Sequence, residues 1–136
     1  MSYSLELVDP VSKNSLILFA PHHMKGGTYP MCGEAYARLN ITYNYSSFYY
    51  KLFPSRSPRT GETTYTSDPN GDISGLRYIY GLTGAESIPV LQDVISKLGD
   101  EANEDYWKAT EGNAKRALLQ LLALAQMRPD GVWQGD

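Results

Sequence analysis

Alternation of apolar and polar positions is clearest over residues 35–45, which read AYARLNITYNY. The apolar positions share one parity and are Leu39, Ile41, Tyr43 and Tyr45. The other parity holds Arg38, Asn40, Thr42 and Asn44. A period of two is typical of a strand with one buried face, and β-branched and aromatic residues suit a pleated surface. We therefore predict a strand whose polar face meets solvent or a ligand.

Further strands are predicted on both sides of this stretch. Residues 3–8 and 15–20 are expected to form a hairpin, because the turn-forming residues 9–14 join them. The run at 16–19, LILF, lacks alternation, which indicates a central strand covered on both faces. Shorter strands are predicted over 48–53 and 76–80. Between them, residues 54–75 predict a long irregular segment, whose composition fits a binding loop and disorder equally well.

Two helices are predicted near the end of the chain. An apolar stripe over 88–98 follows Ser87, the expected N-cap, and Gly99 is placed to end that helix. A second helix should begin after Thr110 or Asn113 and reach about residue 127. Its apolar residues cover well over half of its circumference, so it is either sandwiched between the sheet and the first helix or partly buried against a second copy. We favour a homo-oligomer.

These elements predict an α+β fold in which an antiparallel sheet of about four to five strands packs against two C-terminal helices. A length of 136 residues suits one domain, here 1–136, with strands mainly in 1–53, the irregular loop at 54–75, and a short strand, helices and a tail over 76–136. A single cysteine, Cys32, fits a reducing compartment, and neither a signal peptide nor a membrane span is evident. We expect a cytoplasmic protein that does not engage membranes.

Charge is unevenly distributed along the chain. The net charge of −3 argues against general nucleic-acid binding. Through Gly61, however, six basic residues accompany three acids, and this half also holds seven of the eleven tyrosines and both histidines. A positive surface rich in tyrosine suits an anionic, flat ligand such as a nucleotide. Acids on the wet faces of the later helices explain the asymmetry about as well.

Candidate contacts for such a ligand come from three places: the glycine-rich stretch KGGTY with the histidines before it, the polar strand face, and the start of the long loop. Consecutive glycines can expose a row of backbone N–H groups, and two nearby arginines can close on an anion. A flexible connector is the competing interpretation of KGGTY. The candidates are His22, His23, Lys25, Gly26, Gly27, Thr28, Tyr29, Arg38, Asn40, Arg56 and Arg59.

No catalytic residue set is predicted. Cys32 has no partner at a standard zinc spacing, and adjacent histidines in an extended chain point to opposite faces, so we expect no metal and no cofactor. A Cys32–histidine pair lacks a recognisable signature around it. A small histidine-dependent enzyme acting on a phosphorylated substrate stays open as an alternative.

Four stretches together resemble a family of small uncharacterised proteins encoded by bacteriophages and prophages: KGGT at 25–28, LNITYNY at 39–45, YGLTGAES at 80–87, and residues 109–136. The resemblance carries no catalytic residues. It implies an accessory phage protein that acts by binding, either masking a host protein or sequestering an anionic signalling molecule, such as a nucleotide signal of bacterial immunity. A protein–protein inhibitor or structural phage component that uses the leucine-rich helix is the other binding alternative.

Overall fold

The computed structural model describes residues 2–26, 31–56, 63–64 and 73–136. Its main sheet is antiparallel and has the strand order β4-β1-β7, with β1 (Ser2–Val8) in the centre, β4 (Arg38–Thr42) on one side and β7 (Val132–Gly135) on the other. Leu5 lies opposite Leu39 in β4 and opposite Gly135 in β7. The two ends of the sequence therefore meet in one sheet.

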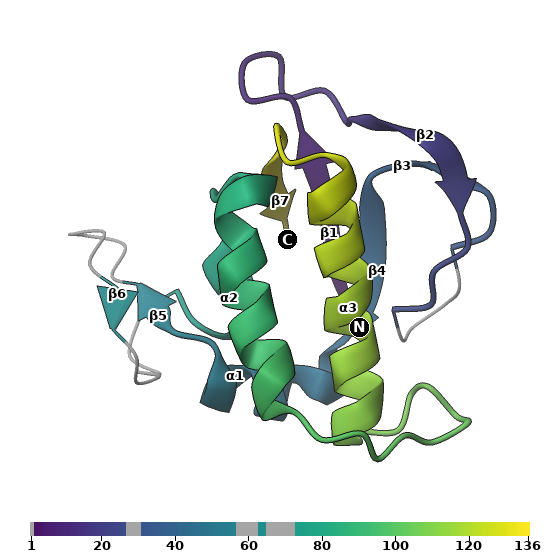
Figure 1. Ribbon diagram of the computed structural model, residues 1–136, viewed down its shortest axis with the longest axis vertical. Helices are drawn as coiled ribbons and strands as arrows, with labels where there is room; N and C mark the ends of the chain where they lie inside the picture. The colour runs from purple at the N-terminus through teal and green to yellow at the C-terminus, as the bar shows by residue number, and fades with distance from the viewer. Residues whose placement is uncertain (1, 27–30, 57–62, 65–72) are drawn as a thin grey trace.

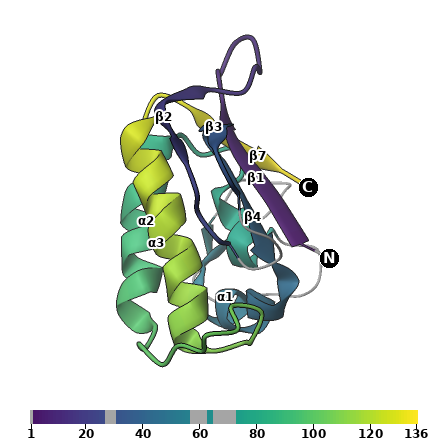
Figure 2. The same ribbon diagram turned by 90° about the vertical axis from the view of Figure 1, so that its right-hand side faces the viewer.

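Two long helices cover one face of this sheet (Figures 1 and 2), and the opposite face, on which the structure describes no long helix, is called the open face below. They are α2 (Gly84–Lys97) and α3 (Glu111–Met127), which pack side by side. The core lies between the helices and the sheet, and it includes Leu5 and Leu39 from the strands and Leu91 and Leu118 from the helices. The shorter helical segments are η1 (Tyr43–Tyr45), α1 (Ser46–Leu52) and η2 (Gly75–Ile79), and α1 lies toward the lower end of the molecule in Figure 1.

The remaining strands form two small antiparallel sheets. One pairs β2 (Ile17–His22) with β3 (Glu34–Tyr36), and the other pairs β5 (Ser55–Arg56) with β6 (Thr63–Thr64). The α+β class and the two C-terminal helices are thus confirmed. The prediction of four to five strands in one sheet was wrong for the described residues, because the strands divide among three sheets.

The predicted strand at 35–45 is correct only in its middle. Thr42 ends β4, and its side chain accepts a hydrogen bond from the Asn44 backbone N–H that starts η1. The aromatic residues that follow belong to helical turns. Tyr45, Tyr49 and Phe53 recur every four residues and are buried, and their rings meet edge to face. The strand predicted at 48–53 was therefore wrong, since its aromatic run holds a helical stripe. The strand predicted at 76–80 is the 3-10 helix η2.

The strand predicted at 15–20 was wrong in both its pairing partner and its environment. The turn closes as expected, with a bridge between Val8 and Ser15, but the chain then leaves β1 and pairs with β3 as β2. Only Leu18 of the apolar run is fully buried, whereas Ile17 and Phe19 are exposed. β2 is therefore not a central strand covered on both faces.

Both helices are capped at their N-termini. The first begins earlier than predicted, because Thr83 and Glu86 form a capping box. Ser87 instead lies inside α2, where its buried hydroxyl donates to the Gly84 carbonyl and accepts from the Trp133 indole N–H. The predicted Thr110 cap of α3 is confirmed. Among the described residues, no helix is both long and apolar enough to cross a bilayer.

Candidate functional site

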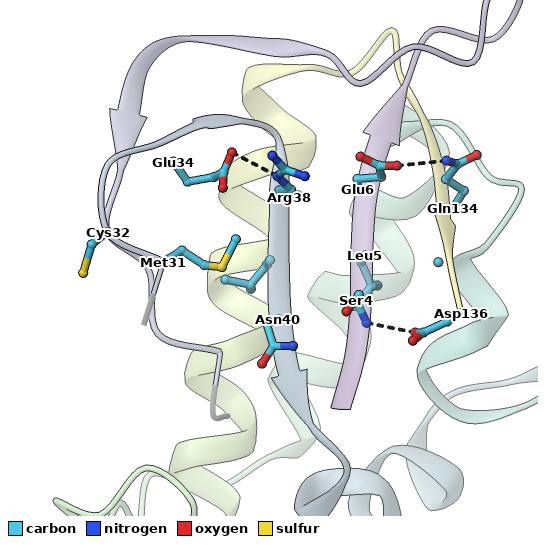
Figure 3. Close-up of a pocket in the computed structure, with 12 residues that line it drawn as sticks. Ser4, Leu5, Glu6, Met31, Cys32, Glu34, Arg38, Asn40, Gln134 and Asp136 are labelled. Atoms are coloured by element: carbon cyan, nitrogen blue, oxygen red, sulfur yellow. Dashed lines mark hydrogen bonds and ion pairs between the residues drawn. The ribbon is translucent and has the colours of Figure 1, made fainter. Parts of the chain in front are cut away.

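The open face of the main sheet carries polar side chains in two rows. Antiparallel register places Glu6 opposite both Arg38 and Gln134, and these three residues form the first row. The second row consists of Asn40, Ser4 and Asp136, because Ser4 lies opposite Asn40 and its backbone N–H donates to Asp136 Oδ1 at 3.0 Å. Figure 3 shows both rows on the side of the strands that faces away from the helices.

A groove of about 810 Å³ lies over these two rows. The segment containing Met31, Cys32 and Glu34 borders the groove beyond β4 (Figure 3). Typical sites for small organic ligands have volumes of roughly 300–1,000 Å³. The groove is therefore large enough for a small molecule, and three strands and the bordering segment supply its lining.

The side chains of the first row all have protein partners. Arg38 Nε lies 3.0 Å from Glu34 Oε1, and its guanidinium stacks 5.0 Å from the centre of the Tyr36 ring. Glu6 accepts hydrogen bonds from the Ser15 hydroxyl at 2.6 Å and from the Gln134 amide at 2.9 Å. Burial opposes ionisation of Glu34, yet the Tyr36 backbone N–H and Arg38 together lower the pKa of this carboxyl. Glu34 therefore stays ionised at neutral pH.

The second row has unused hydrogen-bond acceptors. Asn40 is only 2% exposed, and its amide donates to the Ser2 hydroxyl at 2.7 Å, but its buried Oδ1 has no hydrogen-bond partner. Within the described residues, Asp136 Oδ2 and the Ser4 hydroxyl also lack protein partners. A buried acceptor without a donor costs roughly 1–3 kcal/mol. A ligand that donates hydrogen bonds to this row would recover part of that cost.

Two of the predicted site residues, Arg38 and Asn40, line the groove. His22 lies next to β4, where its Nε2 donates to the Arg38 carbonyl at 2.8 Å while its Nδ1 accepts the Met24 backbone N–H at 3.2 Å. Both ring nitrogens are thus engaged by the backbone, and His22 positions β4 instead of facing a ligand.

The other described residues of this segment have structural contacts of their own. His23 Nδ1 accepts the Gly33 backbone N–H at 3.0 Å, and Lys25 Nζ lies 6.0 Å from the Tyr106 ring centre. Gly26 is buried beside β4, where its carbonyl accepts the Thr42 N–H. Gly27, Thr28 and Tyr29 lie outside the described residues.

Arg56 is separate from the groove. Its Nη2 donates to the carbonyls of Tyr78 at 2.7 Å and Tyr80 at 2.8 Å, and its guanidinium stacks on the Tyr78 ring at 5.2 Å. These contacts fix η2 against β5. Arg59, the second arginine predicted to close on an anion, lies outside the described residues. The first, Arg56, already binds backbone carbonyls.

Sequence reasoning missed the contributions of β1 and β7 to the site. Ser4 and Glu6 alternate with buried Leu5 and Leu7, and Gln134 follows buried Trp133, so period two also marks these polar positions. Their addition changes the electrostatics of the face. Arg38 is accompanied by three carboxylates around the groove, those of Glu6, Glu34 and Asp136. The described part of the lining is therefore net acidic, unlike the positive surface predicted from the first half of the chain.

Among the described residues, no group of three or more His, Cys, Asp or Glu side chains is arranged to hold a metal ion. Comparison with protein-family models, with curated proteins and with solved structures gave no significant match to this chain.

Proposed function

We propose that this chain is a binding protein whose small-molecule ligand occupies the groove on the open face of the main sheet. The observation that carries the proposal is Asn40 Oδ1, a buried acceptor in the lining that has no hydrogen-bond partner. Ordered structures rarely leave such an atom unpaired, and a donor supplied by a ligand is one way to satisfy it. The size of the groove supports the same function.

The biological role that we attach to this binding is sequestration. It follows the resemblance to small phage-encoded proteins, and a signalling molecule of the host is the kind of ligand it implies. An anionic ligand receives less support, because the described basic candidates do not converge: Lys25 lies near Tyr106, Arg38 pairs with Glu34, and Arg56 holds η2. We therefore keep the binding role in the proposal without requiring an anion.

The test compares the wild-type protein with Ser4→Trp, both purified from producing cells and measured by native mass spectrometry. Ser4 is exposed in the middle strand, where an indole fits the solvent side of a sheet but fills the groove. The wild type should carry a small molecule in a 1:1 complex, and Ser4→Trp should carry none. Val11→Trp, at an exposed loop position, is the control and should retain the ligand. An empty wild type, or equal loading of Ser4→Trp, would contradict the proposal.

A second candidate function is a protein interface, which one observation favours. Most leucines of α3 are buried inside the molecule, but Leu119 and Met127 are exposed, as are Ile17 and Phe19 of β2. Phe19 projects fully into solvent beside a cleft of about 400 Å³, lined by Ile17, Leu18, Phe19, Met127 and Arg128. A projecting ring next to a cleft suits a second copy related by a two-fold axis, since each copy would supply both parts.

A further inference from the structure

The charges around the groove identify the kind of ligand that it would select. Among the described lining residues, Glu6, Glu34 and Asp136 contribute three carboxylates, and Arg38 is the one cationic side chain. Arg38 Nε lies 3.0 Å from Glu34 Oε1, and Arg38 also lies opposite Glu6 in the sheet, so one guanidinium faces two of the three carboxylates. The described lining residues therefore carry more negative than positive charge. A cleft lined by one sign of charge concentrates ligands of the opposite sign.

The hydrogen-bonding capacity of the second row points in the same direction. Its free atoms are the Asn40 amide oxygen and Asp136 Oδ2, which accept hydrogen bonds, and the Ser4 hydroxyl, which can also accept. The Asn40 amide nitrogen is already used by Ser2. Asn40 Oδ1 and the ionised Asp136 Oδ2 can only accept, so a ligand that satisfies these two atoms must donate. Ammonium and guanidinium groups donate hydrogen bonds and are positively charged, so they meet both requirements at once.

We infer that the groove binds a small organic cation, with amino or guanidino groups donating to Asn40 Oδ1 and the Asp136 carboxylate across the second row. This inference rests on the proposed binding function and names the chemical class of its ligand. Neighbouring strands are about 4.8 Å apart, and Asp136 Oδ1 reaches back to the Ser4 N–H on the middle strand, so these acceptors lie less than two strand spacings apart. A molecule with two amino groups joined by a short chain reaches both ends of the row.

Arg77 is a further cation near this row, and its guanidinium is held by backbone and ring contacts outside the groove. Its Nε donates to the backbone oxygen of Asp136 at 2.9 Å, and its guanidinium stacks on the rings of Tyr3 at 4.9 Å and Tyr43 at 5.7 Å. Arg77 does not line the groove. It fixes the end of β7 and leaves the Asp136 carboxylate turned toward Ser4.

The experiment titrates labelled protein with spermidine and, in separate samples, with AMP and maltose, following backbone amide resonances. Spermidine should shift the amides of residues 4–6, 38–40 and 134–136, and its affinity should fall as salt is added. Glu6→Gln and Asp136→Asn keep an acceptor but remove a charge, and each should weaken spermidine binding about fivefold. Gln134→Glu, which adds a charge beside Glu6, should tighten it by a similar factor.

Glu104→Gln is the matched control, because Glu104 is an exposed acid outside the groove and its loss should leave the affinity unchanged. Equal weakening by Glu6→Gln and Glu104→Gln would overturn the inference, as would stronger binding of AMP or the absence of spermidine shifts in the groove. The proposed function fails separately. If AMP or maltose shifts the same amides, or a neutral or anionic molecule is lost with Ser4→Trp, the groove is a binding site but its ligand is not a cation.

Discussion

Gly26 and Asn40 show how single residues shape the groove. At Gly26 the chain passes so close to β4 that a Cβ would lie 1.7 Å from the Asn40 carbonyl oxygen. Only glycine allows this approach, which brings the segment after β2 alongside the strand that carries Arg38 and Asn40. The glycine that sequence analysis assigned to an anion-binding loop thus has a packing role in the described structure.

Replacing Gly26 with alanine should therefore destabilise the protein by about 2 kcal/mol or more, because the obstacle is backbone that cannot rotate away. Chemical denaturation of Gly26→Ala measures this loss. Gly99→Ala is the control: the atoms nearest to its Cβ are side-chain atoms of Glu111, at 3.6 Å or farther, so the change should stay within about 0.5 kcal/mol. Equal stability of the two variants would show that the segment moves freely from β4.

At the scale of elements, α2 illustrates how local signals fix a boundary. The Thr83 hydroxyl accepts the Glu86 N–H at 3.0 Å, and the Glu86 carboxylate accepts the Thr83 N–H at 2.9 Å. The negative charge also lies in the first turn, where the helix dipole favours it. The backbone N–H and side chain of Thr83 lower the pKa of Glu86 below its ordinary 4.5.

This lowered pKa gives a pH-dependent prediction. A carboxyl that is more acidic in the folded state stabilises it above the unfolded pKa, and the contribution disappears as pH falls through the folded pKa. Wild type should therefore be more stable than Glu86→Gln at pH 6, and the difference should shrink progressively below about pH 4.5. Denaturation curves between pH 6 and about pH 2.5 measure it. A difference that is independent of pH would show that the ionised carboxylate does not contribute to the cap.

The predictable and unpredictable parts of the fold differ in how far apart in sequence their residues lie. Alternation predicts β4, and spacing with a Thr cap predicts α3, because both signals are local. The aromatic run at 48–53 was misleading, because Phe and Tyr are typical of strands. Its helical signal is the four-residue spacing of the buried Tyr49 and Phe53. Cross-strand pairing cannot be read from local pattern: Ser4 and Asp136 are 132 positions apart.

The whole molecule presents two distinct surfaces, the polar groove on the open sheet face and the apolar area around Phe19. The groove is lined by residues from both ends of the sequence, whereas the apolar area consists of residues of β2 and of the end of α3. Sequence analysis expected the leucines of α3 to mediate oligomerisation. In the structure most of these leucines pack inside the molecule. The exposed apolar side chains of β2 are therefore the observation that now favours a dimer.

If two copies associate through this area, Phe19→Asp should convert a dimer into a monomer, because the cleft is otherwise apolar and its one described cation, Arg128, is already paired with Asp130, so a buried carboxylate would be desolvated without a free partner. Analytical ultracentrifugation of the wild type and this variant provides the measurement. Val11→Asp introduces the same charge at an exposed loop residue and should leave the dimer intact. A monomeric wild type, or a Phe19→Asp protein that still dimerises, would rule out this interface.

The most direct test of the groove as the functional surface is an amide-resolved NMR spectrum of labelled protein, recorded with and without the small-molecule extract of producing cells. We predict shifts confined to the groove strands, at residues 4–6, 38–40 and 134–136, and their loss in Ser4→Trp. Shifts that cluster instead at residues 17–19 and 127–128, or a spectrum that the extract leaves unchanged, would contradict a ligand site on the open face of the sheet.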